Sequence, residues 1–210
     1  MKKFELTTES ITNVAGKKLF RIKALIDFED VKAGELGGYV EKEGNVSQDG
    51  NAWVYDNAWV SGDARVYGNA RVSGDAWVYD NAWVYDNARV SGNARVSGDA
   101  RVYDNAWVYG DARVCGNAWV SGNARVSGDA RVCGNADYTL IQGFGTEFRC
   151  TTFYRGKNKK IMVNCGCFHG DLEEFKKQVK ETRNGKVAKE YLMIADLMEY
   201  HFASEDSDDE

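Results

Sequence analysis

The sequence predicts a mainly β protein whose centre is a parallel β-helix of about five coils. A six-residue period runs without a break from Asn51 to Asn135, and each unit reads Asn/Asp, Ala, Arg/Trp, Val, Tyr/Ser/Cys, Gly/Asp. Alanine recurs at every sixth position from Ala52 to Ala136. Such a period is out of phase with the roughly 3.6 residues of a helical turn but in phase with the two-residue alternation of a strand. Each hexad therefore predicts a short strand followed by a corner.

The two sides of each strand follow from the same unit. Alanine and valine are two positions apart and point to one side, whereas the Arg/Trp between them and the Tyr/Ser after valine point to the other. We therefore expect every Ala and Val of the period to be buried and the Arg/Trp positions to be exposed. At the corners, Gly or Asp followed by Asn or Asp tolerates a positive φ and lets a short side chain bond its own backbone.

Three strands and three corners make one triangular coil of about 18 residues, and successive coils stack about 4.8 Å apart as in-register parallel strands. An open coil at either end would expose unpaired backbone groups, so we expect a cover at each end. The predicted units are a β cap with the first coil at 1–50, the repeats at 51–137, an α+β module at 138–204 and a disordered acidic tail at 205–210.

The N-terminal cap contains two predicted strands, 3–7 and 18–28, that flank a turn. A degenerate hexad at 45–50 follows, with Val46 in the place of the alanine and Gln48 in the place of the valine. This hexad leads into the first regular coil.

In the C-terminal module we predict a β-hairpin of 146–154 and 160–163, followed by two helices. Asp171 can N-cap the first helix, which runs to about Thr182, and the second spans 186–202. Apolar residues at helical spacing are expected to face the core, namely Leu172, Phe175, Val179, Tyr191, Ile194, Leu197 and Met198.

Composition sets bounds on partners and compartment. The formal charge of -5 gives no general attraction to nucleic acid or to an anionic membrane. No apolar run approaches about 18 residues, and the first residues show no signal-peptide pattern, so we expect a cytoplasmic protein without a membrane partner. The odd number of cysteines, five, suits a reducing compartment. Cys115 and Cys133 should stack at a distance that permits a disulfide, but in the cytosol we expect free thiols in the place of serine.

The segment from Cys165 to His169 holds two thiols and an imidazole at close spacing, and Cys150 can lie across the hairpin. A zinc site is one interpretation. A C-x-C pair with a single His is more typical of a turn whose small thiols pack under a helix. We therefore expect no metal and no cofactor.

The outward side chains fall into three columns when they are sorted by coil. On one wall Arg and Trp alternate strictly beside a column of Tyr, and we call its members the Arg/Trp/Tyr wall: Arg65, Tyr67, Trp83, Tyr85, Arg101, Tyr103 and Trp119. The other two walls carry Trp59, Trp77, Arg95, Arg113 and Arg131, and Trp53, Arg71, Arg89, Trp107 and Arg125. Stacked Arg and aromatic planes can stabilise a flat sheet, and exposed Arg, Trp and Tyr also have the composition of interface hot spots. Self-association through a wall, as a dimer or trimer, satisfies both interpretations.

The order Val, any, any, any, Ala, any resembles the hexapeptide-repeat signature of left-handed parallel β-helices, and this resemblance implies a left-handed winding. Proteins of that kind are best known as acyltransferases with a coenzyme A donor and a His base. This chain has two histidines, His169 and His201, and neither lies in the coils. The resemblance therefore transfers the fold without the reaction. The repeats also contain no Thr, which argues against an ice-binding face.

The lead-in formed by the strand 20–25 and the segment 35–41, the repeats, and the segment 166–168 followed by 172–175 together resemble hexapeptide-repeat proteins encoded by phages and prophages. That family implies a bacterial cytoplasm during infection and no established reaction. We expect a non-enzymatic binding protein, in its most concrete form a counter-defence inhibitor that binds a host protein or a nucleotide signal through the Arg/Trp/Tyr wall or the C-terminal module. An acyltransferase-like enzyme that uses coenzyme A is the alternative, and a structural spacer is the third.

Overall fold

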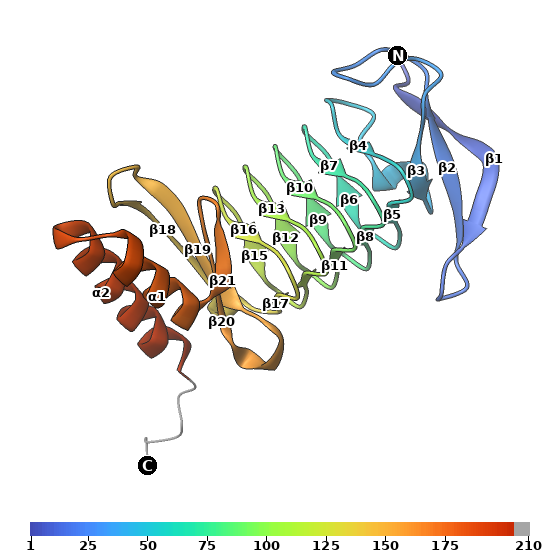
Figure 1. Cartoon of the computed structure of the whole chain (residues 1–210). Helices are drawn as coiled ribbons and strands as arrows, with labels where there is room; N and C mark the ends of the chain where they lie inside the picture. The colour runs from blue at the N-terminus through green and yellow to red at the C-terminus, as the bar shows by residue number, and fades with distance from the viewer. Residues whose placement is uncertain (204–210) are drawn as a thin grey trace.

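The computed structural model describes residues 1–203, apart from the side chain of Asn158. The predicted disordered tail at 205–210 lies outside the described residues. The chain forms an elongated row, with the N-terminal strands at one end, the coils in the middle and two helices at the other end (Figure 1). No helix in the described part of the chain is long and apolar enough to cross a membrane.

Each hexad of the repeat forms a two-residue strand, as predicted, from its Arg/Trp and Val positions. The strands are β4 (Trp53–Val54), β5 (Trp59–Val60), β6 (Arg65–Val66), β7 (Arg71–Val72), β8 (Trp77–Val78), β9 (Trp83–Val84), β10 (Arg89–Val90), β11 (Arg95–Val96), β12 (Arg101–Val102), β13 (Trp107–Val108), β14 (Arg113–Val114), β15 (Trp119–Val120), β16 (Arg125–Val126) and β17 (Arg131–Val132).

Strands that are three hexads apart pair in parallel, which builds the three predicted walls. The orders are β4-β7-β10-β13-β16, β6-β9-β12-β15, and β5-β8-β11-β14-β17. Val90, for example, lies opposite Val72 on one neighbour and Val108 on the other. The result is a β-solenoid of about five turns, which confirms the fold class and the assignment of residues to walls.

The core of the solenoid consists of the two small residues of each hexad. Every repeat alanine from Ala52 to Ala130 and every repeat valine from Val54 to Val132 is fully buried. Two details of the sequence prediction are wrong. Ala136 is exposed, because the chain leaves the coil there in a 3-10 turn, η2 (Asn135–Asp137). Trp53 and Trp59 point outward but are buried, because N-terminal residues pack over them.

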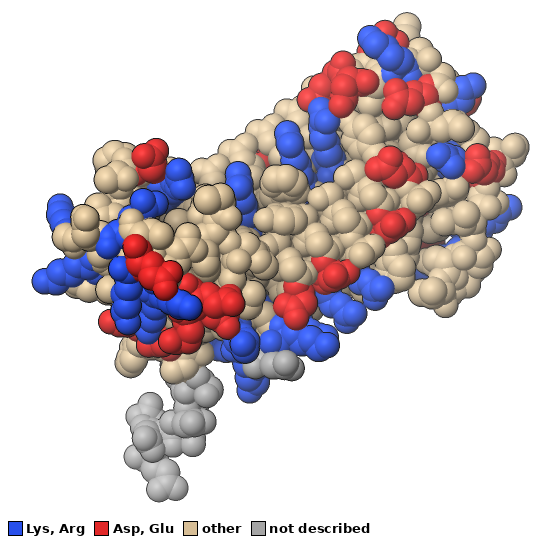
Figure 2. Space-filling model, in the orientation of Figure 1, with Lys and Arg blue, Asp and Glu red and all other residues tan. Residues whose placement is uncertain are grey.

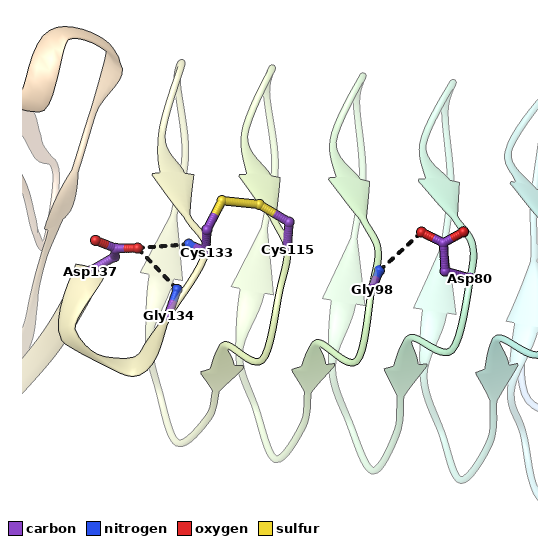
Figure 3. The surroundings of a disulfide bond; sticks show 6 residues. All are labelled: Asp80, Gly98, Cys115, Cys133, Gly134 and Asp137. Carbon is purple, nitrogen blue, oxygen red and sulfur yellow. Dashed lines mark hydrogen bonds between the residues drawn. A yellow bond between two sulfur atoms is a disulfide. The ribbon is translucent and has the colours of Figure 1, made fainter.

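The corners stack through polar side chains that reach from coil to coil. The sixth residue of the hexad has a positive φ, as predicted, at the glycines from Gly62 to Gly128 and at Asp56, Asp80, Asp86 and Asp104. Gly134, in the last hexad, is extended instead, with φ -150°. The carboxylate of Asp80 accepts a hydrogen bond from the backbone N–H of Gly98 at 3.2 Å, one coil further on (Figure 3). Such a corner carboxylate was expected to bond its own backbone, and the structure instead uses it to link neighbouring coils.

The N-terminal cap extends one wall of the solenoid. Its strands are β1 (Phe4–Thr12), β2 (Lys18–Ala24) and β3 (Leu36–Val40), followed by a 3-10 turn, η1 (Glu43–Asn45). Strand β3 pairs in parallel with β5, so the cap and the coils share one sheet. The first strand is longer than predicted and the second ends four residues earlier, at Ala24. Only glycine fits at position 38, because a Cβ there would collide with the carbonyl oxygen of Ala58.

The first coil is closed by an aromatic cluster and a buried lysine. Phe4 and Phe28 contact Trp53 edge-on, with ring centroids 5.9 and 5.3 Å away. Lys3 is buried, and its Nζ donates to the carbonyl oxygen of Ala52 at 2.9 Å. Gln48, in the place of a valine, accepts from the backbone N–H of Lys3 at 2.8 Å. These contacts satisfy backbone groups that an open end would leave unpaired.

We expect the buried Lys3 to make stability rise with pH. Burial lowers the pKa of Lys3 to about 8 from its ordinary 10.5, and below about 8 it is protonated in both the folded and the unfolded chain. Between these two values only the unfolded chain holds the proton, so folding is favoured as pH rises. The free energy of unfolding, relative to a Lys3→Met variant, should increase by roughly 2 kcal/mol between about pH 7 and 9.5. Urea unfolding of both forms measures this, and a difference that stays constant with pH would contradict it.

The C-terminal module is a four-stranded antiparallel sheet with two helices on it. Its elements are β18 (Tyr138–Phe144), β19 (Arg149–Arg155), η3 (Lys157–Lys159), β20 (Ile161–Cys165), β21 (Phe168–Asp171), α1 (Leu172–Thr182) and α2 (Gly185–Phe202). The predicted hairpin is β19–β20, and the outer strands β18 and β21 were missed. Asp171 caps α1 as predicted, accepting from the backbone N–H of Glu174 at 2.9 Å. Of the seven apolar residues assigned to the core, Leu197 is wrong, because it is 57% exposed.

Candidate functional site

The Arg/Trp/Tyr wall is the outer face of the sheet β6-β9-β12-β15. The parallel register places Trp83 between Arg65 and Arg101, and Arg101 between Trp83 and Trp119. The guanidinium of Arg101 lies 5.0 Å from the ring centroid of Trp83 and 4.8 Å from that of Trp119. The structure therefore brings the predicted column together, with a cation stacked between two indoles.

The neighbouring column is a stack of three tyrosines. The rings of Tyr67 and Tyr85 lie 4.9 Å apart and those of Tyr85 and Tyr103 lie 5.0 Å apart, with interplanar angles of 3° and 2°. Tyr67 also meets Trp83 edge-on at 6.1 Å. Burial and the adjacent phenol of Tyr85 raise the pKa of Tyr67, and burial raises the pKa of Tyr85 in the same way. Both phenols therefore keep their protons at neutral pH and remain hydrogen-bond donors.

The wall is accessible to a partner. Arg65 is exposed, Trp119 is 45% exposed, and the other five members are partly exposed. Within residues 1–203, neither Arg65 nor Arg101 forms a salt bridge. Their guanidinium donors are available to an incoming acceptor, while their planes are held by the indoles.

Open hollows lie at the two ends of the wall. One, of about 610 Å³, is lined by Arg65, Tyr67 and Trp83 together with the first-coil segment 43–48. The other, of about 350 Å³, is lined by Tyr103 and Trp119 together with residues of η2 and β18. The wall is thus a ridge of aromatic and cationic side chains between two concave margins.

The N-terminal ends of the other two walls are engaged within the chain. On the β4 sheet, Trp53 is buried, and Arg71 pairs with Glu29 at 2.8 Å and with Asp30 at 2.9 Å. On the β5 sheet, Trp59 is buried among Leu19, Tyr39 and Trp77. The N-terminal cap therefore covers the first-coil tryptophan of these two walls. It leaves the indoles of the Arg/Trp/Tyr wall uncovered.

The segment with the two close thiols forms a turn between β20 and β21, and the expected packing under a helix holds for one thiol only. Cys165, at the end of β20, packs against the cluster under α1 and α2, whereas Cys167, in the turn, is exposed. The Sγ of Cys165 accepts from the Thr151 hydroxyl at 3.1 Å. Among residues 1–203, no group of three or more His, Cys, Asp and Glu side chains is placed to hold a metal ion. The potential zinc ligands, including Cys150 and His169, are therefore not gathered around one point.

Cys115 and Cys133 are joined by a disulfide, so the expectation of free thiols is wrong (Figure 3). Their Cα atoms lie 4.3 Å apart on neighbouring coils. Next to the bond, the Asp137 carboxylate accepts from the backbone N–H groups of Cys133 at 2.9 Å and Gly134 at 3.0 Å. This carboxylate closes the last coil, a role that the sequence pattern did not reveal.

His169 lies outside the coils, as expected, but it approaches the last of them through a tyrosine. Tyr154 is fully buried beneath the final coil, and its hydroxyl lies 3.2 Å from Ser127 Oγ and 3.2 Å from His169 Nε2. Asn164 donates to Ser127 Oγ at 3.0 Å. Burial raises the pKa of Tyr154 to about 12, so this phenol keeps its proton at neutral pH. The group serves to close the solenoid.

Comparison with protein families matches the coils to the YdcK β-solenoid repeat, at residues 64–80, 82–98, 94–110, 106–122, 112–128 and 118–134. All of these segments lie within the solenoid. The chain is therefore similar, over its coils, to β-solenoid repeat proteins of the YdcK type, and this similarity indicates no reaction. Comparison with curated proteins gave no match.

Proposed function

We propose that this chain is a non-enzymatic binding protein and that the Arg/Trp/Tyr wall is its contact surface. The strongest support is the way in which the seven wall residues are stacked, exposed and left without salt bridges. They are stacked in fixed positions, they are at least partly exposed, and neither arginine is used in a salt bridge within residues 1–203. Side chains held in this way lose little entropy on binding, and Trp, Tyr and Arg are the residues that dominate interface energies.

The most specific form of the proposal is a counter-defence protein of a phage that acts in the bacterial cytoplasm. Its target would be a host protein or a nucleotide signal, and a nucleotide would stack its base on an indole and place its phosphate on an arginine. A second copy of the chain is the other partner that suits a partly exposed Tyr stack. The motifs at 35–41 and 166–168 support the phage context only as a resemblance.

The proposal is tested by capture with three forms of the chain. The wild type, the wall pair Trp83→Ala with Arg101→Ala, and the control pair Trp107→Ala with Arg89→Ala are immobilised and exposed to bacterial lysate. We expect the wild type and the control pair to retain the same protein or nucleotide and the wall pair to lose it, with a β-rich circular dichroism spectrum in all three. Equal retention by all forms would move binding to the C-terminal module.

A second variant addresses the acyltransferase alternative. We expect His169→Ala with His201→Ala to leave partner capture and coenzyme A affinity unchanged. His201 contacts Phe202 edge-on, and His169 Nε2 lies 3.2 Å from the hydroxyl of Tyr154, so both histidines lie outside the coils. Isothermal titration with coenzyme A and the same capture assay measure both quantities. If the folded double variant lost coenzyme A binding that the wild type shows, the acyltransferase alternative would be favoured.

A further inference from the structure

A column of cations runs along the sheet that ends at β17. Arg95, Arg113 and Arg131 occupy the same position on β11, β14 and β17, which pair in register. Arg113 and Arg131 are exposed, and the guanidinium of Arg95 lies 3.9 Å from the ring centroid of Trp77. Like charges at directly paired positions repel each other. In the part of the chain that the structure describes, no salt bridge neutralises any of the three.

The C-terminal module carries two further exposed lysines. Lys157 and Lys159 are exposed and lie in the η3 turn, which follows Arg155 and Gly156. Asp137 ties this region to the last coil, because its carboxylate accepts from the backbone of Cys133 at 2.9 Å and pairs with Arg155 at 3.1 Å. Figure 2 shows Lys and Arg side chains along the lower edge of the coils, toward the module, with Asp or Glu side chains beside them. We call this set the basic ridge: Arg95, Arg113, Arg131, Lys157 and Lys159.

The C-terminal end of α2 lies against Arg155, next to the basic ridge. Arg155 donates to the carbonyl oxygen of Phe202 at 3.0 Å, and its guanidinium lies 5.5 Å from that ring centroid. The eight residues that follow Phe202 can extend about 26 Å, whereas Arg131 and Arg95 are two strand spacings, about 10 Å, apart. These residues carry as many carboxylates as the basic ridge has cations, at Glu205, Asp206, Asp208, Asp209 and Glu210.

We propose that the acidic segment 205–210 is an intramolecular ligand of the basic ridge. Charge complementarity, equal numbers of opposite charges and sufficient reach support this occupant. The basic ridge is thus an anion-binding surface on a different sheet from the Arg/Trp/Tyr wall, and the proposal does not depend on what that wall binds. Because Arg113, Arg131, Lys157 and Lys159 are exposed, the contact should weaken at high ionic strength.

The test uses a fluorescently labelled hexapeptide with the sequence of residues 205–210 and measures its anisotropy at low salt. It compares the wild-type chain with a full-length neutral-tail variant that carries Glu205→Gln, Asp206→Asn, Asp208→Asn, Asp209→Asn and Glu210→Gln. We expect the neutral-tail variant to bind the peptide at least about tenfold more tightly, because its own segment no longer competes. About 0.5 M NaCl should abolish the binding.

Two further forms locate the binding surface. Arg95→Gln, Arg113→Gln and Arg131→Gln in the neutral-tail chain should remove peptide binding, whereas the matched triple Arg65→Gln, Arg89→Gln and Arg101→Gln should keep it. Circular dichroism checks that both remain folded. Equal peptide affinity in the wild type and the neutral-tail chain would overturn the proposal. If both bound the peptide equally, the basic ridge would be a site for an external anion. If neither bound it, the basic ridge would not recognise this segment. Equal losses in the two triples would overturn the proposal as well.

Discussion

Replacing Val90 by Asp should lower the free energy of unfolding by roughly 4 kcal/mol or more, which is a large part of the stability of an ordinary domain. Val90 is fully buried, with Val72 and Val108 on the strands beside it. A carboxylate there would lie in a core of Ala and Val with no partner, so it must either stay charged without solvent or take up a proton.

The matched control for this prediction is the preceding residue on the same strand. Arg89 is exposed, so Arg89→Ser should change the free energy of unfolding by about 0.5 kcal/mol or less. Urea unfolding followed by circular dichroism measures both variants. If Val90→Asp were as stable as Arg89→Ser, valine would not be the inward position of the hexad.

The second large effect is expected at Trp53, a residue that the hexad pattern places on the outside. Trp53→Ala should lower the free energy of unfolding by roughly 3–5 kcal/mol, because the indole is fully buried between Phe4 and Phe28 and its removal leaves a cavity. Trp119 holds the same place in its hexad but is 45% exposed. Trp119→Ala should therefore cost about 1 kcal/mol or less.

Thermal unfolding of these two variants shows whether the stability loss depends on the position of the tryptophan in the hexad or on its burial under the N-terminal cap. A large loss at Trp53 alone agrees with a cap that seals the first coil. Similar losses at both positions would mean that the indoles stabilise the solenoid through the sheet itself.

The solenoid could be predicted because its determinants are local and repeated. One hexad defines which side chains point inward, and a coil of three hexads then places Arg65, Trp83 and Arg101 in one column, as the strand register confirms. The stacked tyrosines follow from the same spacing of 18 residues per coil. The geometry of the Arg/Trp/Tyr wall was thus available from the sequence, while its partner was not, because no partner residues belong to this chain.

The errors arose where distant segments meet the coils. The pattern gives the direction of the Trp53 side chain correctly, but its burial depends on Phe4 and Phe28, which come from outside the repeat. The contact of His169 with Tyr154 likewise depends on how the C-terminal sheet docks. The spacing of Cys115 and Cys133 predicted their proximity, but the expected thiol state rested on the assumed compartment, and the structure joins them.

The contact surface is tested most directly by a binding titration with the three forms of the chain. The species retained by the wild type is titrated against the wild type, the wall pair Trp83→Ala with Arg101→Ala, and the control pair Trp107→Ala with Arg89→Ala. If that species is the chain itself, sedimentation equilibrium replaces the titration. We expect the Kd of the wall pair to be about tenfold or more higher, which corresponds to at least about 1.4 kcal/mol of binding free energy, and the Kd of the control pair to change little. Equal weakening by the two pairs, or none by either, would contradict it.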